Sequence, residues 1–366
     1  MKDKQLKARV LAYYLPQYHP IPENDEWWGK GFTEWTNVGK AKKLFPSHYQ
    51  PRVPADLGYY DLRVPETREA QAQMAREAGV EGFVYWHYWL GNGKRLLERP
   101  FNEVVALGKP DFPFAVAWAN QTWSGSLHGL VKGGTLIEQH YGGEADYKAH
   151  FDTLLPAFKD KRYITCEGKP IFIVYDPYSV PDMAGFILLW QRLAKEKGLE
   201  GIYFIALCQN FYYENEREDF YNAMMKFGFD AVNVINMQVP RSKIPFWKRC
   251  WYKICRTFIR TPQLFEYDDR AFMSELCFAH ENAFPSVIPN WDHSPRSGRK
   301  GKVMLGSSPE KFQKTVHYMV EKLQNKHADK RFLFIKSWNE WAEGNYLEPD
   351  LKYGHAWLDA LKSEIF

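Results

Sequence analysis

Short apolar runs alternate with amphipathic stretches along the whole chain. Most of the runs are continuously apolar, which is typical of parallel strands that are buried on both faces. The eight predicted strands are Arg9–Tyr18, Glu81–Trp89, Pro113–Asn120, Pro170–Asp176, Gly201–Gln209, Asp230–Asn236, Pro285–Asp292 and Arg331–Trp338.

Helical patterns lie between these strands. The clearest are Pro65–Ala78, Pro181–Lys197, Pro309–Lys326 and Tyr353–Ile365. The first begins with proline and is followed by Gly79, a typical start and stop for a helix. Strands that each precede a helix predict one (β/α)8 TIM barrel domain over residues 1–366. A doubly wound sheet is the alternative, but no Gly-rich nucleotide turn follows the first strand.

Two long insertions interrupt the alternation and are expected at the C-terminal face of the barrel. Residues 20–60 are rich in Pro, Gly and Trp and should form a wall over the barrel mouth. The second insertion covers about 241–283, and its part 241–262 has seven Lys/Arg, no Asp/Glu and interleaved Phe and Trp. This pattern fits a solvated helix, a surface for an acidic polysaccharide, or an element in peripheral contact with an anionic membrane.

Active sites of such barrels lie where the strands end, and here those ends are polar and aromatic. Amide and imidazole groups can bind sugar hydroxyls, and indole rings can stack on sugar faces. The structural alternatives are satisfied buried polar groups and core packing. Substrate-binding candidates at the strand ends and in the first insertion are Tyr18, Glu34, Trp35, His87, Trp89, Trp118, Asn120, Gln209, Asn236 and Trp291.

The last strand runs into the most informative segment, SWNEWAEGNYLEP at 337–349. Glu340 and Glu343 are three residues apart and share a face if the chain turns helically there. One carboxyl can protonate a leaving oxygen while the other works as base or nucleophile. Asn339 and Trp341 flank the pair and are further substrate-binding candidates. The alternative is a solvated helix start, where acidic residues are common.

This motif also resembles a known family. Asn339-Glu340-Trp341-x-Glu343-Gly344, with Glu348-Pro349, resembles the catalytic motif of glycoside hydrolase family 99, the endo-α-mannosidases and mannanases. The segments YYLPQYH at 13–19, EWTNV at 34–38, YWHYW at 85–89 and AWAN at 117–120 resemble the WbsX-type branch, which is associated with lipopolysaccharide biosynthesis. The resemblance extends from about Val10 to Pro349.

The resemblance implies a retaining (β/α)8 enzyme that needs no metal or cofactor and acts on an oligosaccharide or a surface polysaccharide. By position, Glu340 would be the base that engages the sugar 2-hydroxyl. Glu343 would be the general acid and then the base for incoming water. A nucleophilic Glu340 is the competing role. The long front loop, the basic insertion and Trp341 depart from the mannosidases, so the resemblance does not fix the sugar.

Composition narrows the function further. The net charge of +4 gives no argument for nucleic acid as a partner. Five cysteines without CxxC spacing predict neither a zinc site nor a disulfide framework, and free thiols favour a reducing compartment. Asp292-His293 lacks a third ligand at a recognisable spacing, so no metal is expected. The N-terminus has no signal-peptide core, which predicts a cytoplasmic bacterial protein unless a leader was removed.

Two alternatives to a hydrolase stay open. One is a glycosyltransferase or transglycosylase in the assembly of lipopolysaccharide O-antigen or another surface polysaccharide. The other is a carbohydrate-binding scaffold without catalysis. No Asp-x-Asp and no Gly-rich phosphate loop is present for a nucleotide sugar, which favours the hydrolase. The sequence does not indicate an oligomeric state.

Overall fold

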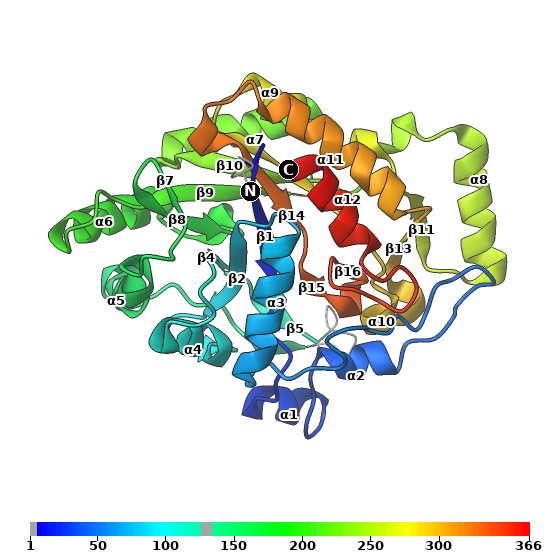
Figure 1. Cartoon of the computed structure of the whole chain (residues 1–366), viewed down its shortest axis with the longest axis horizontal. Helices are drawn as coiled ribbons and strands as arrows, with labels where there is room; N and C mark the ends of the chain where they lie inside the picture. Colours follow the sequence, from blue (N-terminus) through cyan, green and yellow to red (C-terminus); the bar gives the residue numbers. More distant parts are fainter. Residues whose placement is uncertain (1–5, 126–133, 210) are drawn as a thin grey trace.

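The computed structural model describes residues 6–125, 134–209 and 211–366. A closed barrel of parallel strands forms its centre (Figure 1). Its members are β1 (Arg9–Tyr14), β2 (Gly82–Trp89), β4 (Phe114–Trp118), β8 (Lys169–Val174), β9 (Tyr203–Gln209), β10 (Ala231–Ile235), β12 (Ala283–Val287) and β14 (Phe332–Ile335). They follow the order β1-β14-β12-β10-β9-β8-β4-β2, and the pairing of β1 with β2 closes the ring. Each strand predicted from sequence is present, and the (β/α)8 barrel is confirmed.

Helices surround this barrel in the predicted alternation. The outer helices are α3 (Pro65–Glu77), α4 (Arg99–Leu107), α5 (Gly143–Phe158), α6 (Met183–Glu196), α7 (Glu214–Phe227), α9 (Glu275–Ala279), α11 (Pro309–Leu323) and α12 (Ala356–Ile365). The predicted stop after α3 has its expected cause, because Gly79 has a φ of +86°. Across the described ranges, no helix combines the length and the apolar character that crossing a bilayer requires.

Successive residues of each strand point alternately into the barrel and toward the helices. Tyr13 points inward: its hydroxyl donates to Asn233 Oδ1 (2.8 Å), and its ring stacks on Trp86. The next residue, Tyr14, points outward and donates to Gln71 Oε1 of α3 (2.7 Å). This alternation decides which strand-end side chains face the barrel mouth.

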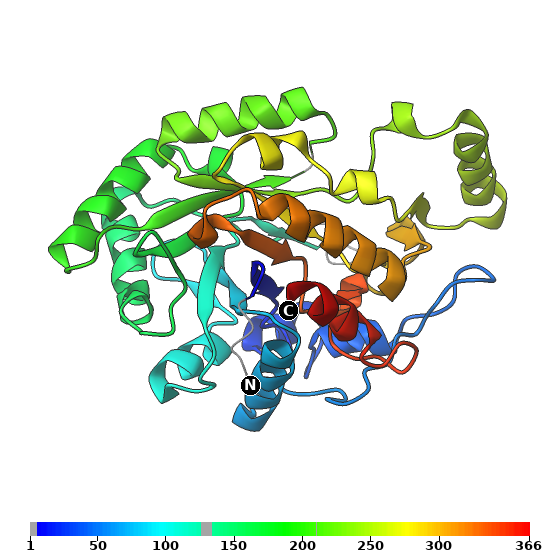
Figure 2. The ribbon, with the colours of Figure 1, turned by 45° about the horizontal axis from the view of Figure 1, so that its top comes forward.

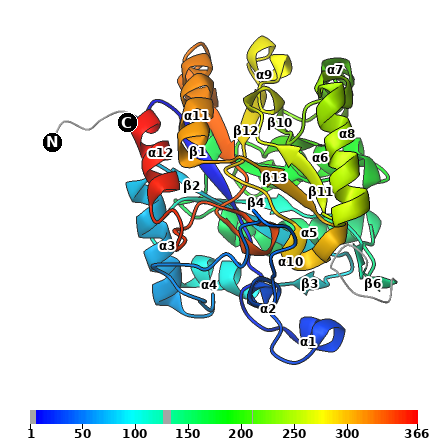
Figure 3. The same cartoon turned by 90° about the vertical axis from the view of Figure 1, so that its right-hand side faces the viewer.

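Shorter elements decorate the barrel. They are α1 (Pro22–Trp28), α2 (Glu34–Gly39), α8 (Phe246–Ile254), α10 (Ser294–Ser297), β3 (Arg95–Leu96), β5 (Trp123–Ser124), β6 (Thr135–Ile137), β7 (Thr165–Cys166), β11 (Gln263–Glu266), β13 (Lys302–Leu305), β15 (Asn339–Glu340) and β16 (Asn345–Tyr346). The first insertion contains α1 and α2, and α2 lies against α10 (Figure 3). The second insertion carries α8, which stands away from the side of the barrel (Figure 2).

Candidate active site

The two glutamates lie on a tight hairpin just after β14. Glu340 ends β15, Glu343 ends a 3-10 turn over Trp341–Glu343, and β16 follows. The expected helical turn is therefore present in its tighter form. Gly344 allows the hairpin to pack closely, because its φ is +55° and an added Cβ would lie 2.7 Å from Asp292 Cβ.

Asn339 holds this hairpin against the exit of β1. Its Oδ1 accepts from the Leu15 N–H (2.7 Å), and its Nδ2 donates to the Leu15 carbonyl (3.1 Å). Tyr18 donates its hydroxyl to the Asn339 carbonyl and accepts from the Trp341 N–H (3.1 Å). Asn339 and Tyr18 therefore position the turn that carries Glu340 and Glu343, and their polar groups are occupied within the protein.

Trp341 supports the turn from beneath. It is 1% exposed, stacks on Tyr346 at 3.8 Å between ring centroids, and donates Nε1 to Glu348 Oε2 (2.6 Å). Burial raises the pKa of Glu348 to about 7. Trp35 packs beside Trp341 and donates to the Tyr60 carbonyl (2.7 Å). Both tryptophans, predicted as substrate-binding residues, pack behind the turn and are not among the residues that line the cavity beside Glu340 and Glu343.

A cavity of about 230 Å³ opens at the C-terminal ends of the strands, and both glutamates line it. The other lining residues are Leu15, Gln17, Trp86, Tyr88, Ala119, Gln121, Thr122, Trp123, Tyr175, His293, Arg296 and Lys336. Aromatic rings therefore surround two carboxyls and two cations. Such a mixture of flat apolar faces and polar tips suits a carbohydrate ring.

A chain of opposite charges connects the two carboxyls. Lys336 Nζ lies 3.3 Å from Glu340 Oε2 and 3.8 Å from Glu343 Oε2. Arg296 donates Nη1 to Glu343 Oε1 and Nε to Glu34 Oε2, the latter at 3.1 Å. Glu34 is 2% exposed. It therefore orients Arg296, and the sequence-based expectation that it binds a sugar hydroxyl is not what its contacts show.

The surroundings separate the two carboxyls in acidity. Burial raises the pKa of Glu340 to about 7; Lys336 opposes this shift, and repulsion from Glu343 adds to it. Burial also disfavours ionised Glu343, but Arg296 and Lys336 outweigh it and lower its pKa. The two side chains share a hydrogen bond. Of the two carboxyls, Glu340 therefore keeps its proton to the higher pH and Glu343 ionises first, opposite to the roles that the resemblance implies.

Three predicted sugar-binding residues lie on the outer face of the barrel wall. His87 Nε2 is 2.8 Å from His150 Nε2 of α5, and Trp89 stacks on the same imidazole at 4.8 Å between ring centroids. Trp118 donates Nε1 to the Trp89 carbonyl (2.8 Å). The alternation of side chains explains this correction, because Trp86 and Tyr88 occupy the inward positions of β2.

The remaining predicted residues support the rim. Asn120 joins the ends of β4 and β8 by donating to the Asp176 carbonyl (2.7 Å) and accepting from its N–H (2.8 Å). Asn236 donates to the Ala271 carbonyl (2.8 Å). Gln209 is hydrogen-bonded to Tyr175, a cavity residue. Trp291 lies under Lys336, with the ammonium 5.3 Å from its ring centroid.

Sequence reasoning did not single out Lys336 or Arg296, and it considered His293 only as a metal ligand. Lys336 had a usable signal, since it lies two residues after the inward-facing Phe334 and continues that side of β14. Arg296 and His293 lie at the short helix α10, outside any strand pattern. Burial and the nearby Arg296 lower the pKa of His293 to about 4, so this imidazole is neutral near pH 7.

Asp292 is engaged within the protein. His48 Nε2 lies 2.7 Å from its Oδ2, and Gln50 donates to the same oxygen (2.8 Å). In the parts of the chain that the structure describes, no group of three or more His, Cys, Asp or Glu side chains is arranged to hold a metal ion.

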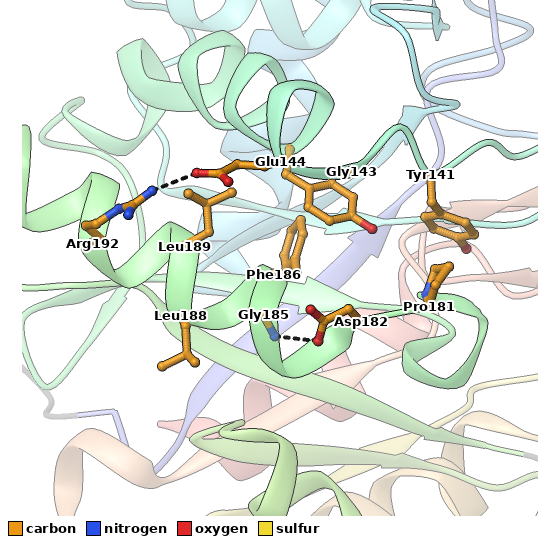
Figure 4. A pocket seen from close by; sticks show the side chains of 11 residues that line it. Tyr141, Gly143, Glu144, Pro181, Asp182, Gly185, Phe186, Leu188, Leu189 and Arg192 are labelled. Atoms are coloured by element: carbon orange, nitrogen blue, oxygen red, sulfur yellow. Dashed lines mark hydrogen bonds and ion pairs between the residues drawn. The ribbon is translucent and has the colours of Figure 1, made fainter.

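A larger cavity of about 580 Å³ lies between α5 and α6 (Figure 4). Its carboxyls serve local structure: Glu144 pairs with Arg192 (2.8 Å), and Asp182 caps the Gly185 N–H (2.9 Å). They do not form a carboxyl pair of the kind found at the barrel mouth. The smaller cavity with Glu340 and Glu343 is therefore the stronger candidate site.

Comparison with other sequences places the chain in a family. Residues 10–361 match the family described as "Glycosyltransferase WbsX". Two relatives from Xanthomonas campestris pv. campestris, both called "Uncharacterized protein WxcX", are 35% and 34% identical over 370 and 375 residues. Each match covers 98% of this chain and 50% of the relative. The chain therefore spans about half the length of these relatives.

Solved structures share the fold. A "Glycoside hydrolase-like protein" superposes with a TM-score of 0.63 at 13% identity, covering 100% of this chain and 95% of that one. The GH99 endo-alpha-mannosidase from Bacteroides thetaiotaomicron superposes with a TM-score of 0.56 at 14% identity, covering 98% and 96%. At such low identity the likeness establishes a common barrel architecture.

Proposed function

Since the chain belongs to the family described as Glycosyltransferase WbsX, we propose that it is a carbohydrate-active enzyme that cleaves glycosidic bonds with Glu340 and Glu343. One observation carries the proposal. The buried carboxyl of Glu340 and the partly exposed carboxyl of Glu343, with opposite protonation preferences, line one aromatic cavity at the mouth of the barrel. Glycosidic-bond cleavage needs such a pair, with one acid and one base at the same pH.

The two carboxyls work as one proton-sharing unit in this proposal. The ligand-free pair holds its proton on Glu340, whereas the roles implied by the resemblance need it on Glu343. Transfer across their shared hydrogen bond converts one form into the other without changing the number of protons. A sugar 2-hydroxyl that donates to Glu340 would favour this transfer, because hydrogen bonds to a carboxylate stabilise its charged form.

The reaction then proceeds in two balanced steps. Glu340 takes the proton of the 2-hydroxyl while that oxygen bonds to the anomeric carbon, and Glu343 gives its proton to the departing oxygen. Water next opens the anhydro-sugar as Glu343 accepts a water proton and Glu340 returns a proton to the 2-oxygen. Two inversions at the anomeric carbon give net retention. The hydrogen-bonded pair supports this course, since inverting enzymes separate their carboxyls by about 6.5–9.5 Å to admit water.

The aromatic wall sets the substrate class. Beside Glu340 and Glu343, the cavity is lined by the aromatic residues Trp86, Tyr88, Trp123 and Tyr175. Gln121 offers an amide group to sugar hydroxyls. We expect a complex or surface polysaccharide with α-linked residues, and α-mannosides are the first to try because the motif resembles endo-α-mannosidases.

A panel of α-linked oligosaccharides and bacterial surface polysaccharides tests the proposal. Release of new reducing ends by the purified chain, with retained anomeric configuration in early products, is the expected result. Cleavage with inversion would overturn the anhydro-sugar course but leave a hydrolase. The absence of cleavage across the panel, together with transfer of sugar from a nucleotide donor, would overturn the hydrolase.

A leaving-group comparison assigns the two roles. If Glu343 is the acid, Glu343→Gln should keep a fast first step, seen as a burst of released aryl alcohol, on substrates with a good aryl leaving group, because such groups depart without protonation. Glu340→Gln should lose activity on both kinds of substrate. The reverse pattern would make Glu340 the acid, in line with the ligand-free proton distribution.

A transferase is the second candidate, and the description of the matched family favours it. The same carboxyl pair can pass a sugar to an acceptor hydroxyl in place of water, as a transglycosylase does. Such an enzyme would build lipopolysaccharide O-antigen or another surface polysaccharide. Titration with nucleotide sugars and with lipid-linked glycans, followed by analysis of products, separates this candidate from a hydrolase.

A further inference from the structure

The second insertion presents large apolar side chains to solvent. We call residues Phe246–Arg260 the basic arm. Phe246, Trp247, Trp251 and Phe258 are 75%, 65%, 54% and 79% exposed, and no residue of α8 is buried. Isolated exposed aromatics are ordinary, but a contiguous group of them marks an interaction surface.

The inner side of the basic arm is fixed to the protein, so its outer side is defined. Lys248 Nζ pairs with Glu266 Oε2 of β11 (2.6 Å), and Tyr252 bonds the same carboxyl. Cys255 is buried below them. At about 100° per residue, these three lie together on one side of a helix. Trp247 and Trp251 lie on a neighbouring row that turns away from β11.

The basic arm is strongly cationic. The segment 241–262 contains seven Lys/Arg and no Asp/Glu. Arg249, Lys253 and Arg256 line a cavity of about 490 Å³ between the arm and the barrel, and none of the described residues that line it is acidic. Tyr212 and Tyr252 also line this cavity and can donate hydroxyl groups to an anion. The arm therefore carries exposed aromatic groups on one side and, on another side, cations that line a site suited to phosphate.

We propose that the basic arm docks the protein on an anionic phospholipid bilayer. Helices at a membrane surface combine aromatic side chains, which enter the head-group boundary, with Lys/Arg that pair with lipid phosphates. A bilayer supplies both an apolar layer for the aromatic side of the arm and negative charge for the cations that flank it. A protein partner would need both an apolar groove and acidic groups matched to the cations of the arm.

Docking would also place the candidate active site close to the membrane. Arg299 donates to the Ile259 carbonyl (3.1 Å) at the end of the basic arm. It follows α10, which carries Arg296, the partner of Glu343. The arm is thus attached to the loop that forms one wall of the cavity. Access to a lipid-linked glycan follows only if the proposed function holds, whereas bilayer binding does not depend on it.

Vesicle sedimentation tests the docking. We expect the protein to bind vesicles of phosphatidylcholine with about one quarter phosphatidylglycerol, and to release on raising salt to about 0.5 M. The variant Trp247→Ser/Trp251→Ser/Phe258→Ser should bind roughly tenfold or more weakly. The control Leu107→Ser/Leu188→Ser removes exposed apolar groups from α4 and α6 and should bind as the wild type does. Circular dichroism checks that both variants fold.

A charge variant completes the test. Lys253→Glu/Arg256→Glu should abolish the preference for phosphatidylglycerol while leaving the aromatic face unchanged. Equal sedimentation of the wild type and the aromatic variant would overturn the proposal. Binding of the wild type only to vesicles of pure phosphatidylcholine would overturn it as well. Self-association that the aromatic variant abolishes, without vesicle binding, would assign the surface to a second copy and also overturn it. Activity on soluble glycans is unaffected by any of these outcomes.

Discussion

Trp86 Nε1 donates a hydrogen bond of 3.0 Å to Glu340 Oε1, across 254 residues of sequence. The indole is itself fixed by stacking on Tyr13 at 4.8 Å between ring centroids. Closure of the barrel between β1 and β2 therefore orients a carboxyl that arrives only at the end of the last strand. The donor stabilises the charged form of Glu340, which the proposed base must adopt.

Replacing Trp86 with Phe tests this contact. The ring remains, but the donor is lost, so the pKa of Glu340 should rise further and activity should fall by about tenfold. The pH profile of kcat/KM checks the direction, since the limb that reports Glu340 should shift to higher pH. Trp118→Phe is the matched control because it removes an indole donor on the outer face of the barrel. An unchanged profile in Trp86→Phe would contradict the assigned contact.

Glu340→Gln should change how stability depends on pH. The pKa of Glu340 rises from 4.5 to about 7 on folding, so between these values the folded chain binds more protons than the unfolded chain. Glu340 therefore lowers the free energy of unfolding as pH rises through this window. The variant lacks this penalty, and its free energy of unfolding relative to wild type should increase by roughly 2–3 kcal/mol from pH 4.5 to pH 8. Urea unfolding at several pH values measures it, and parallel curves would contradict the shift.

Removal of Arg296 should leave the buried Glu34 and the largely covered Glu343 without the cation that they share. Arg296 contacts Glu343 and Glu34 and is itself 9% exposed at its side chain. Arg296→Met should lower the free energy of unfolding near pH 7 by about 3–5 kcal/mol and raise the pKa of Glu343. Adding Glu34→Gln should restore part of the stability, because one of the uncompensated charges is gone. Equal stability of wild type and Arg296→Met in denaturant titrations would argue against this network.

The lining of the cavity predicts which aromatic residues bind substrate. Trp123 lines the cavity, so Trp123→Ala should raise KM by roughly fivefold to tenfold through loss of stacking. Trp89 packs outside the barrel on His150. Trp89→Phe should therefore lower Tm while leaving KM within about twofold. Steady-state kinetics with one oligosaccharide compare the two, and a larger KM effect in Trp89→Phe would reverse their assigned positions.

Much of this architecture was predictable because buried parallel strands appear in the sequence as continuous apolar runs. The same pattern overextends the strands: the apolar run of the first continues to Tyr18, whereas β1 ends at Tyr14, where the chain leaves the sheet for the mouth. Runs that are apolar on both faces also conceal which residues point inward, so His87 was favoured over Trp86. If inward and outward positions are counted from Tyr13 or Phe334, which both point into the barrel, Trp86 is assigned to the inside and His87 to the outside.

The charge network was not predictable from sequence in the same way. Glu34, Arg296 and Glu343 come from three short helical segments far apart in the sequence, and no spacing rule connects them. Their proximity depends on how the first insertion and α10 fold over the mouth. This network sets the pKa difference between Glu340 and Glu343. The sequence could therefore identify the two glutamates but could not indicate which one keeps its proton to the higher pH.

The most direct test of the central claim is kcat/KM of wild type, Glu340→Gln and Glu343→Gln on an α-linked oligosaccharide with an unactivated leaving group. Both variants should fold, as judged by circular dichroism, and each should lose about 10²-fold or more in kcat/KM. Wild-type activity in either folded variant would show that the glutamate pair does not perform the chemistry.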